Sequence, residues 1–224
     1  MRSYQGRDPR GTMSGVKIIP IGKPRTVRQR ILEALGDLLA KQGFDGLSLD
    51  LLARTAGLER GVILRHFQDF DDVVTAFGQS SAFWPTVDEL REDVAERFAA
   101  MPPRAQLAHF FKATIRGLLA RPRTLDILAW ELMSRNRYTR LLEYPRVRSA
   151  LEFFESVTGD VPESLDLTAI VAVLGGAAIF LTVRSRQSGV FGGLNLYDDA
   201  DRERVNRALD LLLSGLIREA ETRQ

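Results

Sequence analysis

The chain has no cysteine and only two histidines among its 224 residues. Without cysteine there is no disulfide bond and no thiolate ligand for a metal, a composition that fits the reducing cytoplasm. The sequence also contains no HExxH, Gly-x-Ser-x-Gly or P-loop motif, so a zinc site and a nucleophilic triad both lack their usual residues. We therefore expect no enzyme activity, no catalytic residue, no metal and no cofactor.

Strand patterns and export signals are missing as well. Residues 1–24 contain Gly, Pro, Ser and Arg but not the apolar core of a signal peptide, which predicts a cytoplasmic location. The longest uncharged run, residues 167–183, has 17 residues, at the lower limit of the length that crosses a bilayer. Its threonines and its Gly175-Gly176 pair lower the hydrophobicity, so a buried helix explains the run better than a membrane span does.

Net charge is small, at a formal +2, but it is unevenly distributed. Residues 1–67 hold 12 Lys/Arg against 6 Asp/Glu, a net of +6, whereas residues 68–224 hold 19 against 23, a net of −4. A basic N-terminal part on a mildly acidic body indicates a polyanionic partner. Residues 1–24 form a flexible basic arm, which either contacts DNA or is a leader with little role.

Helical periodicity runs through the rest of the chain. Two short helical patterns lie within Ser48–Phe67, and the other helices are expected at Thr26–Gly43, Asp69–Ser81, Pro85–Ala100, Arg104–Ala120, Thr124–Asn136, Arg140–Val157, Leu165–Gln187 and Asp199–Glu221. These patterns predict an all-α fold. We place a three-helix domain at residues 25–70 and a larger helical bundle at residues 71–224.

The segment Ser48–Phe67 has the layout of a helix-turn-helix. Ser48 is suited to cap the first short helix, and Gly57 is suited to the left-handed conformation that ends it. The second helix has an apolar stripe on one side and the charged side chains Arg60 and Arg65 on the other. Two helices joined by a tight glycine turn, the second short and basic, are typical of a DNA-binding motif.

The surrounding residues give this motif a family resemblance. In order along the chain they are Arg30-Ile31-Leu32-Glu33-Ala34, Leu38, Leu39, Gly43, Phe44, Ser48, Leu52-Ala53, Ala56-Gly57-Leu58, Gly61 and His66-Phe67. This order and spacing resembles the N-terminal domain of TetR-type transcriptional regulators, from about Thr26 to Ala76, roughly a quarter of the chain. Two positions depart from the family pattern: Leu64 replaces a tyrosine that usually contacts phosphate, and Phe70 replaces a lysine that usually begins the fourth helix.

The resemblance and the residue chemistry together predict the DNA contacts. Ser48 and His66 contact phosphate by family position, and Arg28 is a weaker phosphate contact. Arg60 and Arg65 are expected to reach base edges, because the arginine fork matches guanine, and Val62 is expected to lie near a thymine methyl group. The partner implied is double-stranded DNA with a palindromic operator.

The larger bundle is expected to bind a small-molecule inducer and to dimerise. Candidate pocket residues are aromatic or soft side chains together with acids beside apolar stretches: His109, Phe110, Asp126, Trp130, Glu131, Met133, Phe154 and Phe180. The alternatives are that the aromatic residues are core, and that Asp126 and Glu131 pair with Arg123 or Arg135 one turn away.

The last two long helices form a four-helix dimer interface in TetR-type proteins. By this resemblance the interface of a homodimer is expected at Leu174, Gly175, Ala178, Leu209, Leu212, Leu213 and Leu216. A two-fold dimer would place its two DNA-binding helices about 34–36 Å apart, one turn of DNA.

The predicted function is therefore a sequence-specific DNA-binding regulator, a repressor released from its operator by an inducer. The alternative is an all-α dimeric module that binds a ligand or a protein and has weakened DNA binding, a possibility that Leu64 and Phe70 keep open.

Overall fold

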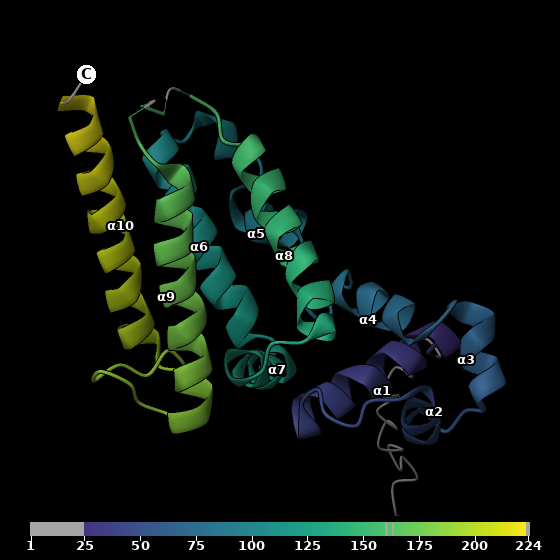
Figure 1. Cartoon of the computed structure of the whole chain (residues 1–224). Coiled ribbons are helices and arrows are strands. Elements are labelled where there is room, and N and C mark those ends of the chain that lie inside the picture. Colours follow the sequence, from purple (N-terminus) through teal and green to yellow (C-terminus); the bar gives the residue numbers. More distant parts are fainter. Residues whose placement is uncertain (1–24, 160, 163, 223–224) are drawn as a thin grey trace, which may run out of the picture.

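The computed structural model describes residues 25–159, 161–162 and 164–222, so the basic arm at residues 1–24 lies outside the described residues. Within these residues the chain forms ten α-helices and two 3-10 helices and no β-strand, which confirms the all-α prediction. The helices (Figure 1) are α1 Val27–Gln42, α2 Leu49–Ala56, α3 Arg60–His66, α4 Phe70–Gly78, α5 Val87–Arg91, α6 Pro103–Leu119, α7 Pro122–Met133, α8 Arg137–Glu155, α9 Leu167–Ser188 and α10 Asp199–Thr222, with the 3-10 turns η1 Glu92–Val94 and η2 Phe98–Ala100.

Helices α1, α2 and α3 form a small bundle at one end of the molecule, in the lower right of Figure 1. Thr26 begins α1 with a capping box, in which its side chain accepts from the Gln29 N–H and the Gln29 side chain binds back to Thr26. Ile31, Leu52 and Ile63, one from each helix, are fully buried in a shared core. Burial of one apolar stripe from each short helix is what holds them, since helices of this length are marginal alone.

The three-helix bundle is packed firmly against the body through two contacts. Helix α4 lies along α8 and α1, and α7 crosses α1. At the second contact the indole of Trp130 covers Gly43 and donates a 3.1 Å hydrogen bond to the Ala40 carbonyl. Gly43 has a φ of 72°, and a Cβ there would lie 2.8 Å from the indole ring. Only glycine therefore fits under Trp130.

The body is built around α6, which packs against α5, α9 and α10. Its core is rich in phenylalanine: Phe98, Phe110, Phe111 and Phe153 are all buried, and the rings of Phe110 and Phe153 lie 4.8 Å apart. In Figure 1, α9 and α10 run antiparallel at the end of the molecule opposite α3.

Three expected helices differ from the observed ones. The single helix expected at residues 85–100 is broken into α5, η1 and η2; α5 starts after a capping box on Thr86, and the Leu90 carbonyl is held by the ring of His109 at the break. Helix α8 starts three residues early because the Asn136 side chain caps it. Leu58 lies outside α3, which begins only at Arg60.

Among the described residues, helix α9 is long and apolar enough to cross a membrane by length and composition alone, and only 22% of its most apolar part is buried inside the chain. It packs on α6 and α7 through Leu174, Ala178, Thr182 and Val183. One side of α9 is therefore buried and the other is exposed, so the expectation of a buried helix holds for only part of the run.

Candidate functional site

Helix α3 presents a free, basic outer face. Ile63 and Phe67 anchor its inner side, with 0% and 4% of their surfaces exposed. Arg60, Arg65 and His66, with Gly61 and Leu64, are exposed on the outer side. A seven-residue helix held by two buried side chains can enter a groove without disturbing its own anchors.

The turn before α3 is fixed by backbone conformation and by one side chain from α1. Gly57 has φ 61° and ψ 42°, the left-handed conformation predicted for it, and its N–H closes the end of α2. The Arg30 guanidinium donates to the carbonyls of Ala56 and Gly57, at 3.0 and 3.5 Å. Arg30 therefore braces the turn from α1, a role that sequence periodicity had not indicated because it depends on a contact 26 residues away.

The predicted phosphate and base contacts have distinct surroundings. Ser48 caps α2, accepting from the Leu51 N–H at 3.2 Å. Arg28 lies over the ring of Phe67, 5.1 Å from its centroid, next to the end of α3. Arg60 pairs with Asp50 of α2 at 3.6 Å, and both side chains are well exposed, so this contact is weak. Val62 is only half-buried.

The two departures from the family pattern have different explanations. Leu64 has 42% of its surface exposed on the outer face of α3, so it can meet a partner only by apolar contact. Phe70 is buried, and its ring packs edge-on against Tyr138 of α8, with centroids 5.4 Å apart. Beside it, Arg137 pairs with Asp71 at 2.9 Å. The phenylalanine in place of lysine thus links the three-helix bundle to the body.

The eight predicted pocket residues do not converge on one cavity. Phe110 and Phe154 are packed together in the body core, with ring centroids 4.7 Å apart. Trp130 is engaged with α1, Met133 is 75% exposed, and Phe180 is 42% exposed beside Phe191. These residues follow helical periodicity, which fixes a face but not which neighbour the face meets.

The acids in that set pair across helices rather than along one. Asp126 binds Arg186 of α9 at 3.1 Å, and Glu131 binds Arg146 of α8 at 2.7 Å. The alternative of pairing with Arg123 or Arg135 was therefore wrong, and Arg123 instead pairs with Asp37 of α1 at 2.8 Å. Burial raises the pKa of the Glu131 carboxyl, with Arg146 acting in the opposite sense.

His109 is a core residue. Its Nε2 lies 2.7 Å from the Leu90 carbonyl oxygen, to which it donates, and 3.4 Å from Asp93. Burial lowers the pKa of His109, partly offset by the Leu90 carbonyl and by Asp93. The ring thus fixes the end of α5 and lines none of the three hollows described next.

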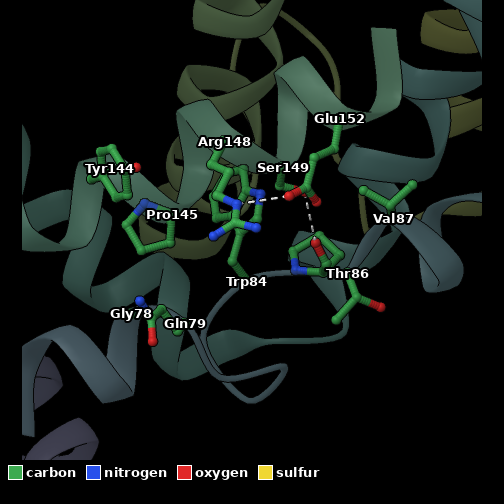
Figure 2. A pocket seen from close by; sticks show the side chains of 11 residues that line it. Gly78, Gln79, Trp84, Thr86, Val87, Tyr144, Pro145, Arg148, Ser149 and Glu152 are labelled. Carbon is green, nitrogen blue, oxygen red and sulfur yellow. Dashed lines mark hydrogen bonds and ion pairs between the residues drawn. The ribbon is translucent and has the colours of Figure 1, made fainter. Parts of the chain in front are cut away.

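Three hollows of about 320–340 Å³ open on the surface of the body, at the lower end of the size of ligand sites. One, which Figure 2 shows, lies between the end of α4 and α8 and is lined by Gly78, Gln79, Trp84, Pro85, Thr86, Val87, Tyr144, Pro145, Arg148, Ser149 and Glu152. The second, called here the α7–α9 hollow, is lined by Leu128, Glu131, Leu132, Ser134, Arg135, Thr139, Glu143, Arg146 and Ile179. The third, beside α5, is lined by Asp88, Arg91, Ala95, Phe98, Ala99 and Ser156.

The predicted dimer residues divide into two groups. Four of them are buried in the chain's own core and are therefore not available for a dimer interface, which corrects the prediction: Leu174, Ala178, Leu209 and Leu213. Leu212 and Leu216 are exposed, and Gly175 faces open space. The exposed apolar face of α9 and α10, called here the α9/α10 face, consists of Ala169, Ala172, Val173, Gly176, Ala177, Phe180, Ala208, Leu211, Leu212 and Leu216. Periodicity found the apolar helices, but both of their sides are apolar, so it could not separate the inner from the outer one.

Comparison with known proteins agrees with this architecture. Residues 31–77 match the family model of bacterial regulatory proteins of the tetR family. The chain is 33% identical over 82 residues to the HTH-type transcriptional repressor AcnR of Corynebacterium diphtheriae, a match that covers 37% of this chain and 40% of the repressor. The match therefore spans less than half the length of that curated relative.

Solved structures share the fold over most of the chain. The fatty acid degradation regulator FadR of Bacillus halodurans is 18% identical, with a TM-score of 0.59 over 85% of this chain and 96% of that one. FadR of Bacillus subtilis in complex with stearoyl-CoA is 16% identical, with a TM-score of 0.60 over 82% and 96%. A tetR family regulator from Shewanella sp. PV-4 is 18% identical, with a TM-score of 0.61 over 83% of this chain and 96% of that one. Residues 31–77 thus match the tetR family model, and most of the chain shares the all-α fold of the solved regulators.

Proposed function

We propose that this protein is a sequence-specific DNA-binding repressor that acts as a homodimer in the cytoplasm and is released from its operator by a small molecule. The observation that carries the proposal is the outer face of α3, where Arg60, Arg65 and His66 are exposed on a helix whose inner side is anchored. A short basic helix of this kind fits the major groove of DNA. The similarity to a transcriptional repressor supports the repressing sign.

Within this proposal each residue has a separate task. Arg60 and Arg65 read guanine edges, and the exposed Leu64 and half-buried Val62 face thymine methyl groups. Ser48, His66 and Arg28 contact phosphates, which sets the position of the helix but carries no sequence information. Loss of a base-reading arginine should therefore relax specificity, and loss of a phosphate contact should weaken all sequences alike.

The α9/α10 face is the proposed dimer interface. Val173, Leu211 and Leu212 have 68%, 75% and 53% of their surfaces exposed. An apolar face that spans two long helices is unusual on a monomer and marks an interaction surface. Gly176 has nothing near its Cβ position, so a partner helix can approach closely there. Two-fold pairing through this face would present two copies of α3 to the same side of a DNA duplex.

Release requires a ligand that prefers a state of the dimer whose two α3 helices no longer fit successive grooves. The contacts between body and three-helix bundle support such a link, since Tyr138 packs on Phe70 and Trp130 binds the end of α1. A movement of α7 or α8 is therefore transmitted to the DNA-binding helices by packed side chains rather than by a flexible linker.

The test is selection of genomic fragments by the purified protein at ~0.1 M salt, repeated with Arg65→Ala and with Arg204→Ala, because salt sets the apparent affinity. Arg204 is a matched control: it is an exposed arginine on α10 that pairs with Asp201. We expect an inverted repeat with the wild type and with Arg204→Ala, and its loss or relaxation with Arg65→Ala. Recovery of random fragments by all three proteins would reject operator recognition.

A second candidate rests on Leu64. An exposed leucine at the centre of the outer face of α3 would suit an apolar protein partner as well as DNA. If selection recovers no operator, the proposed function becomes that of a dimeric ligand-binding or protein-interaction module, and Leu64→Ala would then abolish the protein contact.

A further inference from the structure

The α7–α9 hollow differs from the hollow of Figure 2 because it contains a buried carboxylate oxygen without a hydrogen-bond partner among the described residues. In the hollow of Figure 2 the Arg148 guanidinium binds Glu152 at 2.7 Å, and the Ser149 hydroxyl donates to the Pro85 carbonyl at 3.4 Å. Both contacts are drawn there as dashed lines. In the α7–α9 hollow, one carboxylate oxygen, Oε1 of Glu131, is buried and has no hydrogen-bond partner among the described residues.

The Glu131 carboxylate is held but only half satisfied. Its Oε2 accepts from the Arg146 guanidinium at 2.7 Å, and both side chains are close to 90% buried. Arg146 is itself fixed, because its guanidinium also lies over the ring of Trp84 at 5.6 Å. Burial of a carboxylate oxygen that accepts no hydrogen bond destabilises the protein. A ligand that donated a hydrogen bond to Oε1 would remove this penalty, and the gain would favour binding.

The remaining walls define what would carry that donor. Leu128, Leu132 and Ile179 supply apolar surface on α7 and α9. Glu143 and Arg135, at the rim, are exposed and of opposite charge, so solvent screens their influence. The buried end of the site thus favours a positive N–H donor and the open end favours an apolar body. Leu132 is 60% exposed and lines the hollow together with Glu131.

We propose that the α7–α9 hollow is the effector site of this protein, and that its ligand is a small molecule with an ammonium or amidinium group on an apolar body, bound by Glu131. The regulatory role of the ligand rests on the proposed function. The existence of the ligand-binding site does not depend on it. The volume of about 330 Å³ suits a ligand the size of a substituted aromatic amine.

The corner between α7 and α8 connects this hollow to the DNA-binding bundle. Ser134, Arg135 and Thr139 of the corner line the hollow. Two of the three residues between Arg135 and Thr139, namely Arg137 and Tyr138, contact Asp71 and Phe70 at the start of α4. This short corner therefore contacts the hollow through some of its residues and the start of α4 through others.

A second connection runs through α7. Trp130, the neighbour of Glu131, covers Gly43 at the end of α1. Occupation of the hollow would therefore act on the three-helix bundle at α1 and on α4, the helix that follows α3, and such a displacement could release the protein from DNA.

Benzylamine and benzyl alcohol are the probes that test the site, because they share a ring and differ in the charged donor. Binding is measured by titration calorimetry and by the emission of Trp84 and Trp130, the two tryptophans of the chain, which lie beside Arg146 and Glu131. We expect benzylamine to bind about ten-fold or more tightly than benzyl alcohol. Glu131→Gln should remove this difference, and Glu152→Gln, in the hollow of Figure 2, should keep it. Equal binding of the two probes to the wild type would overturn the proposal.

A further variant guards against a Glu131→Gln protein that does not fold. Leu132→Lys places a cation at the mouth of the hollow at an exposed position, so the fold is retained and benzylamine alone should be repelled. Val147→Lys, an equally polar change at an exposed position on α8, should leave both probes unaffected. Unchanged benzylamine binding to Leu132→Lys would place the amine elsewhere and reject the site.

DNA binding is measured separately on the selected operator, with and without millimolar benzylamine. Release of the wild type but not of Leu132→Lys supports the effector role. Glu131-dependent benzylamine binding by a protein that selects no operator would retain the site and reject the repressor function. If the protein binds its operator but Glu131→Gln leaves benzylamine binding unchanged, the repressor function is retained and the proposed site is rejected.

Discussion

The ring of Phe70 meets the ring of Tyr138 edge-on, with centroids 5.4 Å apart and planes at 74°. Phe70 is the first residue of α4 and Tyr138 the second of α8, so this pair spans the junction between the DNA-binding bundle and the body. The edge-on geometry is the favourable one for aromatic rings. The position where the resemblance to TetR-type regulators implies a lysine is here part of the core.

A double-mutant cycle on this pair should measure the junction directly. We expect Phe70→Leu and Tyr138→Leu each to lower the free energy of unfolding, and the two changes to be coupled by about 0.5–1.5 kcal/mol, the range for aromatic pairs. Urea unfolding of the wild type, both single variants and the double variant gives the coupling. Purely additive effects would mean that the two rings do not stabilise each other.

Two glycines at the end of α1 differ in what an added Cβ would cost. Gly43 and Gly46 both have positive φ, at 72° and 66°, but a Cβ on Gly43 would meet Trp130, whereas one on Gly46 would have no described residue within 4 Å. Gly46→Ala should therefore cost about 1–2 kcal/mol from the backbone alone. Gly43→Ala should cost clearly more, because its ψ of −143° gives a backbone conformation that is essentially restricted to glycine and because its Cβ would meet the indole. Thermal or urea unfolding compares them, and equal losses would show that the indole does not press on Gly43.

The exposed Leu64 offers a gain-of-function test. The resemblance to TetR-type regulators implies a phosphate-contacting tyrosine here, and the position is 42% exposed beside the basic residues of α3. We expect Leu64→Tyr to strengthen operator binding by a few-fold, since one added hydrogen bond is worth about 0.5–1.5 kcal/mol. Leu64→Phe is the control because it adds the ring without the hydroxyl. Fluorescence anisotropy with labelled operator would contradict the idea if tyrosine and phenylalanine behaved alike.

The buried ring of His109 should make stability depend on pH. Burial lowers its folded pKa below the usual histidine value of 6.5, so the unfolded chain binds more protons between the two values. Stability therefore falls as pH decreases from about 7 through this range. Asp93, Arg116 and Lys112 face the ring; Asp93 favours the charged form and the two cations oppose it. His109→Gln keeps an N–H donor near the Leu90 carbonyl and should flatten the slope of unfolding free energy between pH 7 and 5. An unchanged slope would assign the dependence to other groups.

Local signals predicted the DNA-binding end of this chain well. Ser48 and Gly57 each act on the backbone within a few residues of their own position, so the cap and the turn were predicted and are confirmed. The partners of Glu131 and Trp130 depend on how α7 crosses α8 and α1, and no local pattern fixes a crossing. The same limit applies to α9, because a helix that is apolar all round does not indicate which side faces its own core. In α10 the run Leu211-Leu212-Leu213 places leucine on both the buried and the exposed side.

The α9/α10 face leads to a prediction about assembly. Leu211 is 75% exposed in the middle of α10, with Val173 of α9 at 68%, and a charge buried in an apolar interface has no partner to offset its desolvation. Leu211→Glu should therefore shift the protein from dimer to monomer, and because two linked α3 helices bind DNA far more tightly than one, operator binding should fall with it. Val147→Glu, at a 51% exposed position on α8, makes the same chemical change outside the face and should leave the dimer intact. Light scattering coupled to size exclusion reports the mass of each variant. A Leu211→Glu protein that remained a dimer would place the interface on another surface, and two-fold presentation of α3 would then have to be derived from that surface instead.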